Sequence, residues 1–160
     1  MFTDDFLSIS LAEVLGLLVT LLGIWLVVRQ LNEAKLASQM EGLLTLGNQF
    51  TELQEKRTIM RNSERKDWNS LSPEEAYTRV WDDPELKSAY IEIGNHFDLV
   101  GTLVSANALS YDMAAKMYKS VVPPIYERLE KVIQVDRIKL DDPFLYEQWA
   151  WLSKEFEKRS

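Results

Sequence analysis

The side chains of this sequence that could do chemistry begin with its single histidine, His96. Glu92 lies one helical turn earlier and Asp98 lies two residues later, and a carboxylate beside an imidazole can help to move a proton. His96 nevertheless belongs to no catalytic motif, and the chain has no cysteine, no glycine-rich phosphate loop and no nucleophile motif. We therefore predict a histidine packed in a core and bonded to a neighbour, no catalytic residue and no enzyme.

Adjacent carboxylates, a residue type that can hold metal ions, occur in three pairs: Glu74/Glu75, Asp82/Asp83 and Asp141/Asp142. Each pair stands where a helix is expected to begin, and there the free backbone amides and the helix dipole favour acids without any metal. The chain also lacks the Glu-x-x-His pair of a di-iron bundle. The sequence therefore predicts no metal site and no cofactor.

One basic cluster contains Lys56, Arg57, Arg61, Arg65 and Lys66. Arg57, Arg61 and Arg65 share one face of a helix, because they are spaced four residues apart. The cluster is either a solvated face near the carboxyl end of a helix, where cations are favoured, or a site for an anion or a protein partner. The sequence leaves both interpretations open.

The most informative stretch is apolar: LAEVLGLLVTLLGIWLVV, residues 11–28, has Glu13 and Thr20 as its polar residues. A helix of about 18 to 20 residues, rising about 1.5 Å per residue, is about 27 to 30 Å long and matches the hydrocarbon core of a bilayer. The preceding MFTDDFLSIS lacks the basic stretch of a cleaved signal peptide, and no small-residue cleavage site follows the run. We expect one transmembrane helix that lies in a lipid bilayer.

Charges flank this span unevenly. Asp4 and Asp5 precede it, whereas Arg29 and Lys35 follow it, so the positive-inside rule places the amino terminus outside and the rest of the chain in the cytosol. All 18 Lys and Arg residues follow position 28, together with all but three of the 25 acidic residues. The net charge of that part is about −4, which argues against nucleic acid as a partner. The absence of cysteine agrees with a reducing compartment.

Small residues form a stripe along the span. Gly16, Thr20 and Gly23 share one side of the helix, and small side chains let a second membrane helix approach closely. Glu13 stands at the head of this stripe. With Ser10 it forms a capping-box pattern, so we interpret it as a helix cap in the wet outer interface, with a proton- or partner-binding acid as the alternative. The interface predicted for the membrane helix is Glu13, Gly16, Thr20 and Gly23.

Helical periods recur along the chain, and no alternating run of β-branched residues appears, so the predicted fold class is all-α. A helix that reaches Asn62, and that can continue the span without a break, carries an apolar stripe: Leu36, Met40, Leu43, Gly47 and Phe50. We expect an amino-terminal tail and transmembrane helix in residues 1–30, a juxtamembrane cytosolic helix in residues 31–62, and a small cytosolic helical bundle in residues 63–160. A loop is expected over residues 62–73.

Three helix starts are marked by a capping residue followed by proline: Ser72-Pro73, Asp83-Pro84 and Asp142-Pro143. A further helix should begin near Ser110 and kink or restart at Pro123-Pro124. The helix after Asp83 has one face that should be buried: Leu86, Tyr90, Ile93, Phe97, Val100 and Val104. The last helix has a similar face, made of Leu145, Trp149, Leu152 and Phe156.

Three stretches of these helices resemble a known family: NHFDLVGTLVS, YERLEKVI and WAWLSKEF. The family is a group of uncharacterised bacterial single-span proteins, in which an amino-terminal membrane helix precedes a small cytosolic helical domain of unknown function. Tyr126 stands where a tryptophan is common in that family, and the resemblance covers residues 11–155. The family's Asn-Phe, acid and Gly-Leu pattern is approximated here by Asn95, Phe97, Asp98 and Gly101. The resemblance implies no catalytic residue.

The sequence therefore predicts a protein of the bacterial inner membrane that acts by binding protein. Its partner would be a second copy of itself or a larger membrane complex of which it is an accessory subunit, with contacts through the glycine stripe and the cytosolic helix faces. One alternative is a membrane-tethered sensor or defence component that binds an anion at Arg57, Arg61 and Arg65. The other is a membrane-tethered enzyme with His96 near a pocket.

Overall fold

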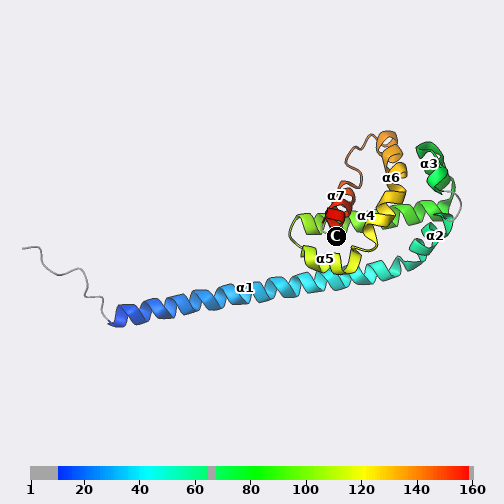
Figure 1. Ribbon diagram of the computed structural model, residues 1–160. Coiled ribbons are helices and arrows are strands. Elements are labelled where there is room, and N and C mark those ends of the chain that lie inside the picture. Colours follow the sequence, from blue (N-terminus) through cyan, green and yellow to red (C-terminus); the bar gives the residue numbers. More distant parts are fainter. Residues whose placement is uncertain (1–10, 65–67, 159–160) are drawn as a thin grey trace, which may run out of the picture. The chain divides into compact units, whose positions relative to one another are not determined.

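The computed structural model describes residues 11–64 and 68–158, and this part of the chain contains helices and no strand (Figure 1). The predicted all-α fold class is therefore confirmed. The elements are α1 (Leu11–Glu52), α2 (Gln54–Glu64), the short 3-10 helix η1 (Trp68–Ser70), α3 (Pro73–Asp82), α4 (Pro84–Ser105), α5 (Tyr111–Tyr118), α6 (Val122–Lys139) and α7 (Glu147–Lys158).

Contacts divide the chain into two units, of which one ends at Met40 and the other begins at Glu41. The boundary lies inside α1, because Leu43 and Phe50 pack against the core of the second unit, to which buried Leu46 belongs. The first unit is thus the amino-terminal part of α1. The second unit contains the end of α1 and the helices from α2 to α7.

In the first unit, the side chains described between residues 13 and 38 are all exposed. They include the large apolar side chains of the run from Val14 to Val28, and by length and composition α1 can cross a membrane. Leu36 and Met40 are also 53% and 44% exposed, whereas Phe50 packs against the core of the second unit. The apolar stripe predicted to follow the span is therefore covered only in its second half.

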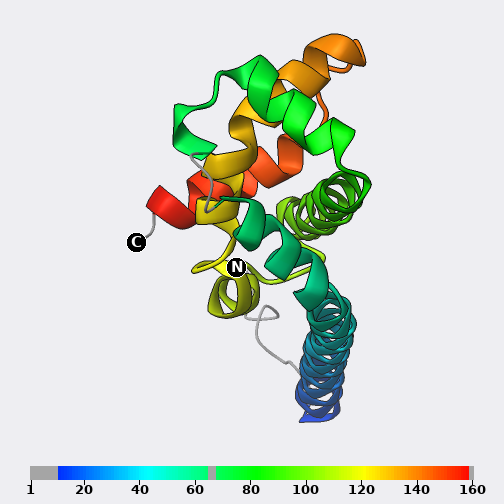
Figure 2. The same ribbon diagram turned by 90° about the vertical axis from the view of Figure 1, so that its right-hand side faces the viewer.

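The central helix of the second unit is α4, which contacts α2, α3, α5 and α7 (Figure 2). Its predicted face is buried as expected: Leu86, Tyr90, Ile93, Phe97, Val100 and Val104. Two glycines let the segment around the start of α7 lie close to this helix. A Cβ at Gly94 would collide with the ring of Tyr146, and one at Gly101 would collide with the backbone carbonyl of Gln148.

Two of the three predicted helix starts are confirmed. Ser72 begins α3 in a capping box: its hydroxyl accepts from the amide of Glu75, and the Glu75 carboxylate accepts from the amide of Ser72. Asp83 begins α4, where its Oδ1 accepts hydrogen bonds of 3.0 and 3.1 Å from the amides of Glu85 and Leu86.

The third predicted start, at Asp142-Pro143, is wrong. The amide of Phe144 donates to Asp142 Oδ1 at 3.0 Å, but the segment remains a turn and α7 begins only at Glu147. Tyr146 has a φ of 55°, a left-handed conformation that an α-helix cannot include, and its ring is buried against the α4 glycine at position 94. Burial of this ring outweighs the local capping pattern.

Two interruptions divide the remaining helices. A new helix begins at the two prolines, as predicted: α5 ends at Tyr118, and α6 begins at Val122 with both prolines in its first turn. The helix predicted to reach Asn62 is instead divided into α1 and α2 at Leu53. Its backbone hydrogen bonds continue there, since the Leu53 amide donates to the carbonyl of Gln49 at 3.0 Å.

Candidate functional site

Three arginines line one pocket of the second unit. Helix α2 supplies Arg57 and Arg61, one helical turn apart, and α6 supplies Arg128. None of the described residues that line this pocket is acidic. It has a volume of about 190 Å³, and its other lining residues are Met60, Ser120, Val121, Pro124 and Ile125. We call it the arginine pocket; it combines concentrated positive charge with a small apolar wall.

Buried neighbours hold the two helices that carry these arginines. Met60 is only 4% exposed and fixes α2 against the core. Trp68 of η1 is equally buried, and its indole N–H donates to the carbonyl oxygen of Arg128 at 2.8 Å. The backbone at Arg128 is thereby tied to the segment that follows α2.

Arg57 is the most enclosed of the three. Its guanidinium lies over the ring of Phe50, 4.2 Å from the centroid, which is a cation–π contact. Its Nε is buried and has no hydrogen-bond partner. Burial, and then the neighbouring charge of Arg61, lower the pKa of Arg57, but a guanidinium stays protonated at any physiological pH. Arg57 is therefore a cation held partly away from water beside another cation.

The basic cluster predicted from the sequence is only partly assembled. Lys56 is directed to α4, where its Nζ donates to Ser88 Oγ at 2.9 Å and lies 3.2 Å from Glu92 Oε1. Arg65 and Lys66 lie outside the described residues.

Sequence reasoning missed Arg128 as a pocket residue. In the sequence Arg128 is only a basic residue that follows two prolines. Nothing in that local pattern indicates that it lines the same pocket as two arginines of α2.

His96 lies in the core, as predicted, but the predicted bond to a neighbour is not formed at its Nε2. It is 6% exposed and its ring stacks on Phe50 at 5.6 Å, with the rings of Phe97 and Tyr118 at its edges. Its Nε2 is buried and has no hydrogen-bond partner, and burial lowers the pKa of this imidazole to about 4. His96 is therefore a neutral member of an aromatic cluster.

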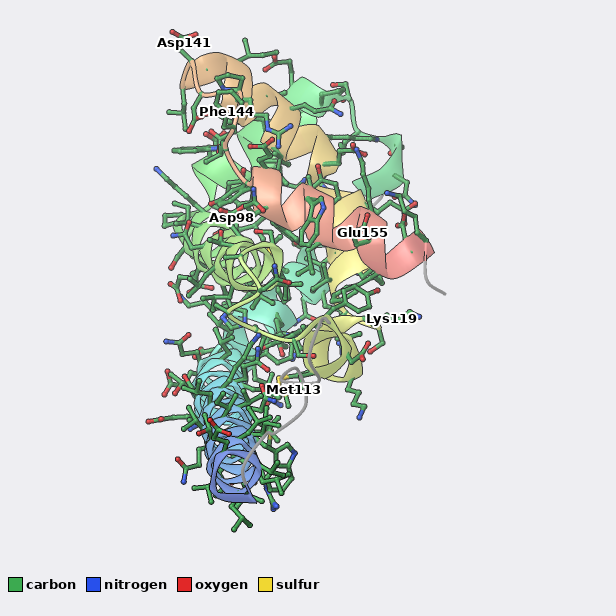
Figure 3. All side chains as sticks on the ribbon, turned by 90° about the vertical axis from the view of Figure 1, so that its left-hand side faces the viewer. Asp98, Met113, Lys119, Asp141, Phe144 and Glu155 are labelled. Carbon is green, nitrogen blue, oxygen red and sulfur yellow. The ribbon has the colours of Figure 1, made fainter. Side chains whose placement is uncertain are left out.

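The acids that could have acted with His96 are engaged elsewhere. Glu92 pairs with Lys56, and the Asp98 carboxylate accepts a hydrogen bond of 3.0 Å from the backbone amide of Trp149. Figure 3 shows Asp98 on α4, at the side where α7 begins. Asp98 thus satisfies a free amide in the first turn of α7.

The acidic pairs also have local partners. Glu75, Asp83 and Asp142 each accept from a backbone amide near their own position. In the part of the chain that the structure describes, no three His, Cys, Asp or Glu residues lie in a group that could hold a metal ion. One carboxylate of each pair therefore accepts a hydrogen bond from a nearby backbone amide.

One buried acid went unnoticed in the sequence. Asp136 is 2% exposed; its Oδ2 accepts from the hydroxyl of Tyr90 at 2.9 Å, while its Oδ1 is buried with no partner. Burial raises the pKa of this carboxyl. The sequence did indicate its burial, because Asp136 continues the helical spacing of the apolar residues Leu129 and Ile133 along α6.

The residues predicted for the membrane-helix interface lie in the first unit. Nothing lies within 4 Å of the Cβ position at Gly16 or Gly23, and the hydroxyl of Thr20 donates to the carbonyl of Gly16 at 2.9 Å. This side of the helix is therefore smooth and carries no unsatisfied hydroxyl. Glu13 is exposed in the first turn of α1, and Ser10, its predicted capping partner, lies outside the described residues.

Comparison with known proteins identifies a family for this chain. The family described as a domain of unknown function, DUF4760, matches residues 10–156. No curated protein and no solved structure matches the chain. The match begins before the first described residue and ends inside α7, so it includes the apolar part of α1 as well as the helical bundle.

Proposed function

We propose that this chain, which belongs to the DUF4760 family of domains of unknown function, is a membrane-anchored protein-interaction module with no catalytic activity of its own. One observation carries the proposal: a run of large apolar side chains between Val14 and Val28 is exposed on α1. Soluble proteins rarely expose apolar patches larger than a few hundred Å². A lipid bilayer would cover this run without any protein neighbour.

The proposed orientation has the amino terminus outside and the helical bundle in the cytosol of a bacterial inner membrane. Arg29 and Lys35 follow the apolar run, which is the pattern of a cytoplasmic flank. Arg29 forms an ion pair of 2.9 Å with Glu33 and also lies 5.7 Å from the ring centroid of Trp25. Tryptophan and a basic residue one turn apart suit the interface between lipid and water.

The proposed partner is a second copy of the chain or a larger membrane complex. Gly16 and Gly23 leave the smooth side of α1 open, and the Thr20 hydroxyl is already satisfied within the helix. A second helix could approach this side closely, and close approach is what stabilises helix pairs in lipid. The chain carries a net charge of −7, which does not favour nucleic acid.

Native mass spectrometry of the full chain, extracted from its own membrane in mild detergent, tests this proposal. We expect the chain in the membrane fraction after alkaline carbonate washing, and then as a complex of fixed stoichiometry, either with itself or with another membrane protein. A chain found in the soluble fraction would contradict the anchor. A membrane-bound chain that is always monomeric and alone would contradict the interaction module.

A second candidate function is a membrane-tethered sensor or defence component that binds an anion. The arginine pocket favours it, because Arg57, Arg61 and Arg128 line one small space. This candidate shares the membrane anchor with the first. It differs in needing a ligand rather than a protein partner.

A further inference from the structure

We propose that the turn between α6 and α7 docks into an apolar pocket with a basic border on another protein. We call residues 138–144, which form this turn, the exposed turn. The proposal rests on the proposed function and deepens it, because it takes the partner to be a protein of a larger membrane complex rather than a second copy. It concerns the second unit alone and does not depend on the glycine stripe of α1.

Exposed apolar side chains are concentrated in the exposed turn. Five large apolar side chains are exposed in the described part of the second unit, and three of them lie in these seven residues: Ile138 at 81%, Phe144 at 69% and Leu140 at 55%. The other two, Leu44 and Leu99, lie on α1 and α4. Scattered apolar residues are normal on a protein surface, whereas a group of them marks an interaction site.

Hydrogen bonds hold the exposed turn in a defined conformation. The amide of Asp142 donates to the carbonyl of Arg137 at 3.0 Å, and the Asp142 carboxylate accepts from the amide of Phe144. Arg137 Nε donates to the carbonyl of Leu145 at 2.9 Å. Tyr146, with its φ of 55°, is buried and anchors the turn, while Phe144 stays exposed. A side chain that is already held in place loses little freedom when it binds.

The charges around the exposed turn favour a basic partner. Asp141 and Phe144 lie together at the end of α6, where the chain turns back toward α7 (Figure 3). Asp141, Asp142 and Glu147 are exposed there. Lys139 is the one basic residue of the exposed turn, and its Nζ lies 3.5 Å from Oε2 of Glu74 on α3. The exposed acids therefore set the sign of this surface, and a surface of opposite charge would complement it.

The same charges argue against two other neighbours. Anionic lipids give the cytoplasmic leaflet a negative surface, which repels acidic side chains. Two copies of the chain that met through their exposed turns would bring the acids of both copies together, and like charges across an interface cost free energy. A pocket with apolar walls and a border of lysine or arginine fits both features, because it would cover Phe144 and pair the acids.

Photo-crosslinking of the full chain in its own membrane tests the proposal. The photoreactive analogue p-benzoylphenylalanine takes the place of Phe144, and in a control chain it takes the place of Leu99, the exposed apolar residue of α4. Mass spectrometry then reads the sequence of each peptide joined to the analogue. We expect position 144, and not position 99, to be joined to a protein of another sequence, at an apolar peptide with more Lys and Arg than Asp and Glu.

Substitutions that remove either feature should weaken the same complex in native mass spectrometry. Phe144→Ser should raise its dissociation constant by about tenfold or more. Asp141→Asn combined with Glu147→Gln should have a smaller effect that disappears at high salt, and asparagine tolerates the φ of 52° at position 141. Leu99→Ser and Glu127→Gln are the matched controls and should change nothing. All five side chains are exposed, so the variants should keep the unfolding midpoint of the parent.

Several outcomes would overturn the proposal. They are a crosslink from position 144 to this chain itself, to lipid, to a peptide without excess basic residues or to nothing, and a Phe144→Ser chain that assembles as the parent does. If a complex forms that none of these variants changes, the exposed turn is not its interface and the proposed function stands. If the chain is always monomeric and alone, the proposed function fails as well.

Discussion

His96 and Asp136 place two ionisable side chains inside an aromatic core, and each has a buried atom with no hydrogen bond. Burial acts on them in opposite directions: it lowers the pKa of the imidazole to about 4 and raises the pKa of the carboxyl. Both shifts favour the neutral form of the side chain. At the scale of single residues, the core of the second unit is therefore sensitive to pH.

The first prediction is that His96 lowers the stability of the fold in acid. The unfolded chain should protonate His96 near its ordinary pKa of 6.5, whereas the folded chain resists protonation until about pH 4. Between these values the unfolded state binds more protons, so the contribution of His96 to stability is full above pH 6.5 and falls by at most about 3 kcal/mol on the way to pH 4.

Denaturant unfolding of the parent and of His96→Leu between pH 7.5 and about 4.5 measures this contribution. Asp136 has the opposite slope, because its raised pKa makes the folded state bind the proton first and gain stability as the pH falls. That slope is common to both chains and cancels in their difference. A difference in unfolding free energy between the two chains that stays constant with pH would refute the prediction.

At the scale of helices, three residues of the pattern noted in the sequence, Phe97, Asp98 and Gly101, lie where α4 contacts α7. Phe97 packs against the ring of Trp149 at 5.5 Å, Asp98 accepts from the Trp149 amide, and Gly101 leaves room for the backbone of Gln148. The three positions act together, because the cap requires the close approach that the glycine permits. We infer that these three positions form a packing motif.

Gly101→Ala should separate these helices. The added Cβ would meet the backbone carbonyl of Gln148, which cannot move aside as a flexible side chain can, so we expect a loss of about 1–3 kcal/mol in unfolding free energy. Gly42→Ala in α1 is the control, since nothing lies within 4 Å of its Cβ position and alanine favours a helix by about 1 kcal/mol. Equal effects of the two substitutions in denaturant unfolding would contradict the close approach.

The small-residue stripe on α1 gives a second prediction at this scale. Replacing Gly16 and Gly23 together by Ile adds bulk on the smooth side of α1 and should weaken association by on the order of 1–2 kcal/mol. Leu17→Ile, on another side of the helix, should change little. Native mass spectrometry in mild detergent reads the fraction of complex. Identical fractions for all three chains would show that the stripe is no interface.

Interactions within a few residues were predictable from the sequence, and long-range ones were not. Ser72 and Asp83 cap helices through amides two or three residues away, so their patterns alone identified α3 and α4. At Asp142 the same pattern failed, because the buried ring of Tyr146 sets the backbone of that segment. Arg128 reaches the arginine pocket only through the packing of α6, which no local pattern encodes.

At the scale of the whole molecule, the chain combines an apolar helix with a helical bundle that has its own core. Among the described side chains of the first unit, from residue 13 to Met40, no large apolar one is buried, whereas the second unit is centred on the buried face of α4. A chain with these two parts would be poorly soluble without lipid and well folded once its helix is inserted. The central claim is therefore that the helix spans a membrane with the bundle on the cytosolic side.

Cysteine accessibility tests that claim most directly, because the chain contains no cysteine of its own. Ser8→Cys and Ser160→Cys, prepared as separate single variants, are treated in intact cells with a membrane-impermeant maleimide. We predict labelling at position 8 in intact cells, and labelling at position 160 only after the inner membrane is permeabilised. The reverse pattern would contradict the orientation, and labelling of both positions in intact cells would contradict a helix that separates them.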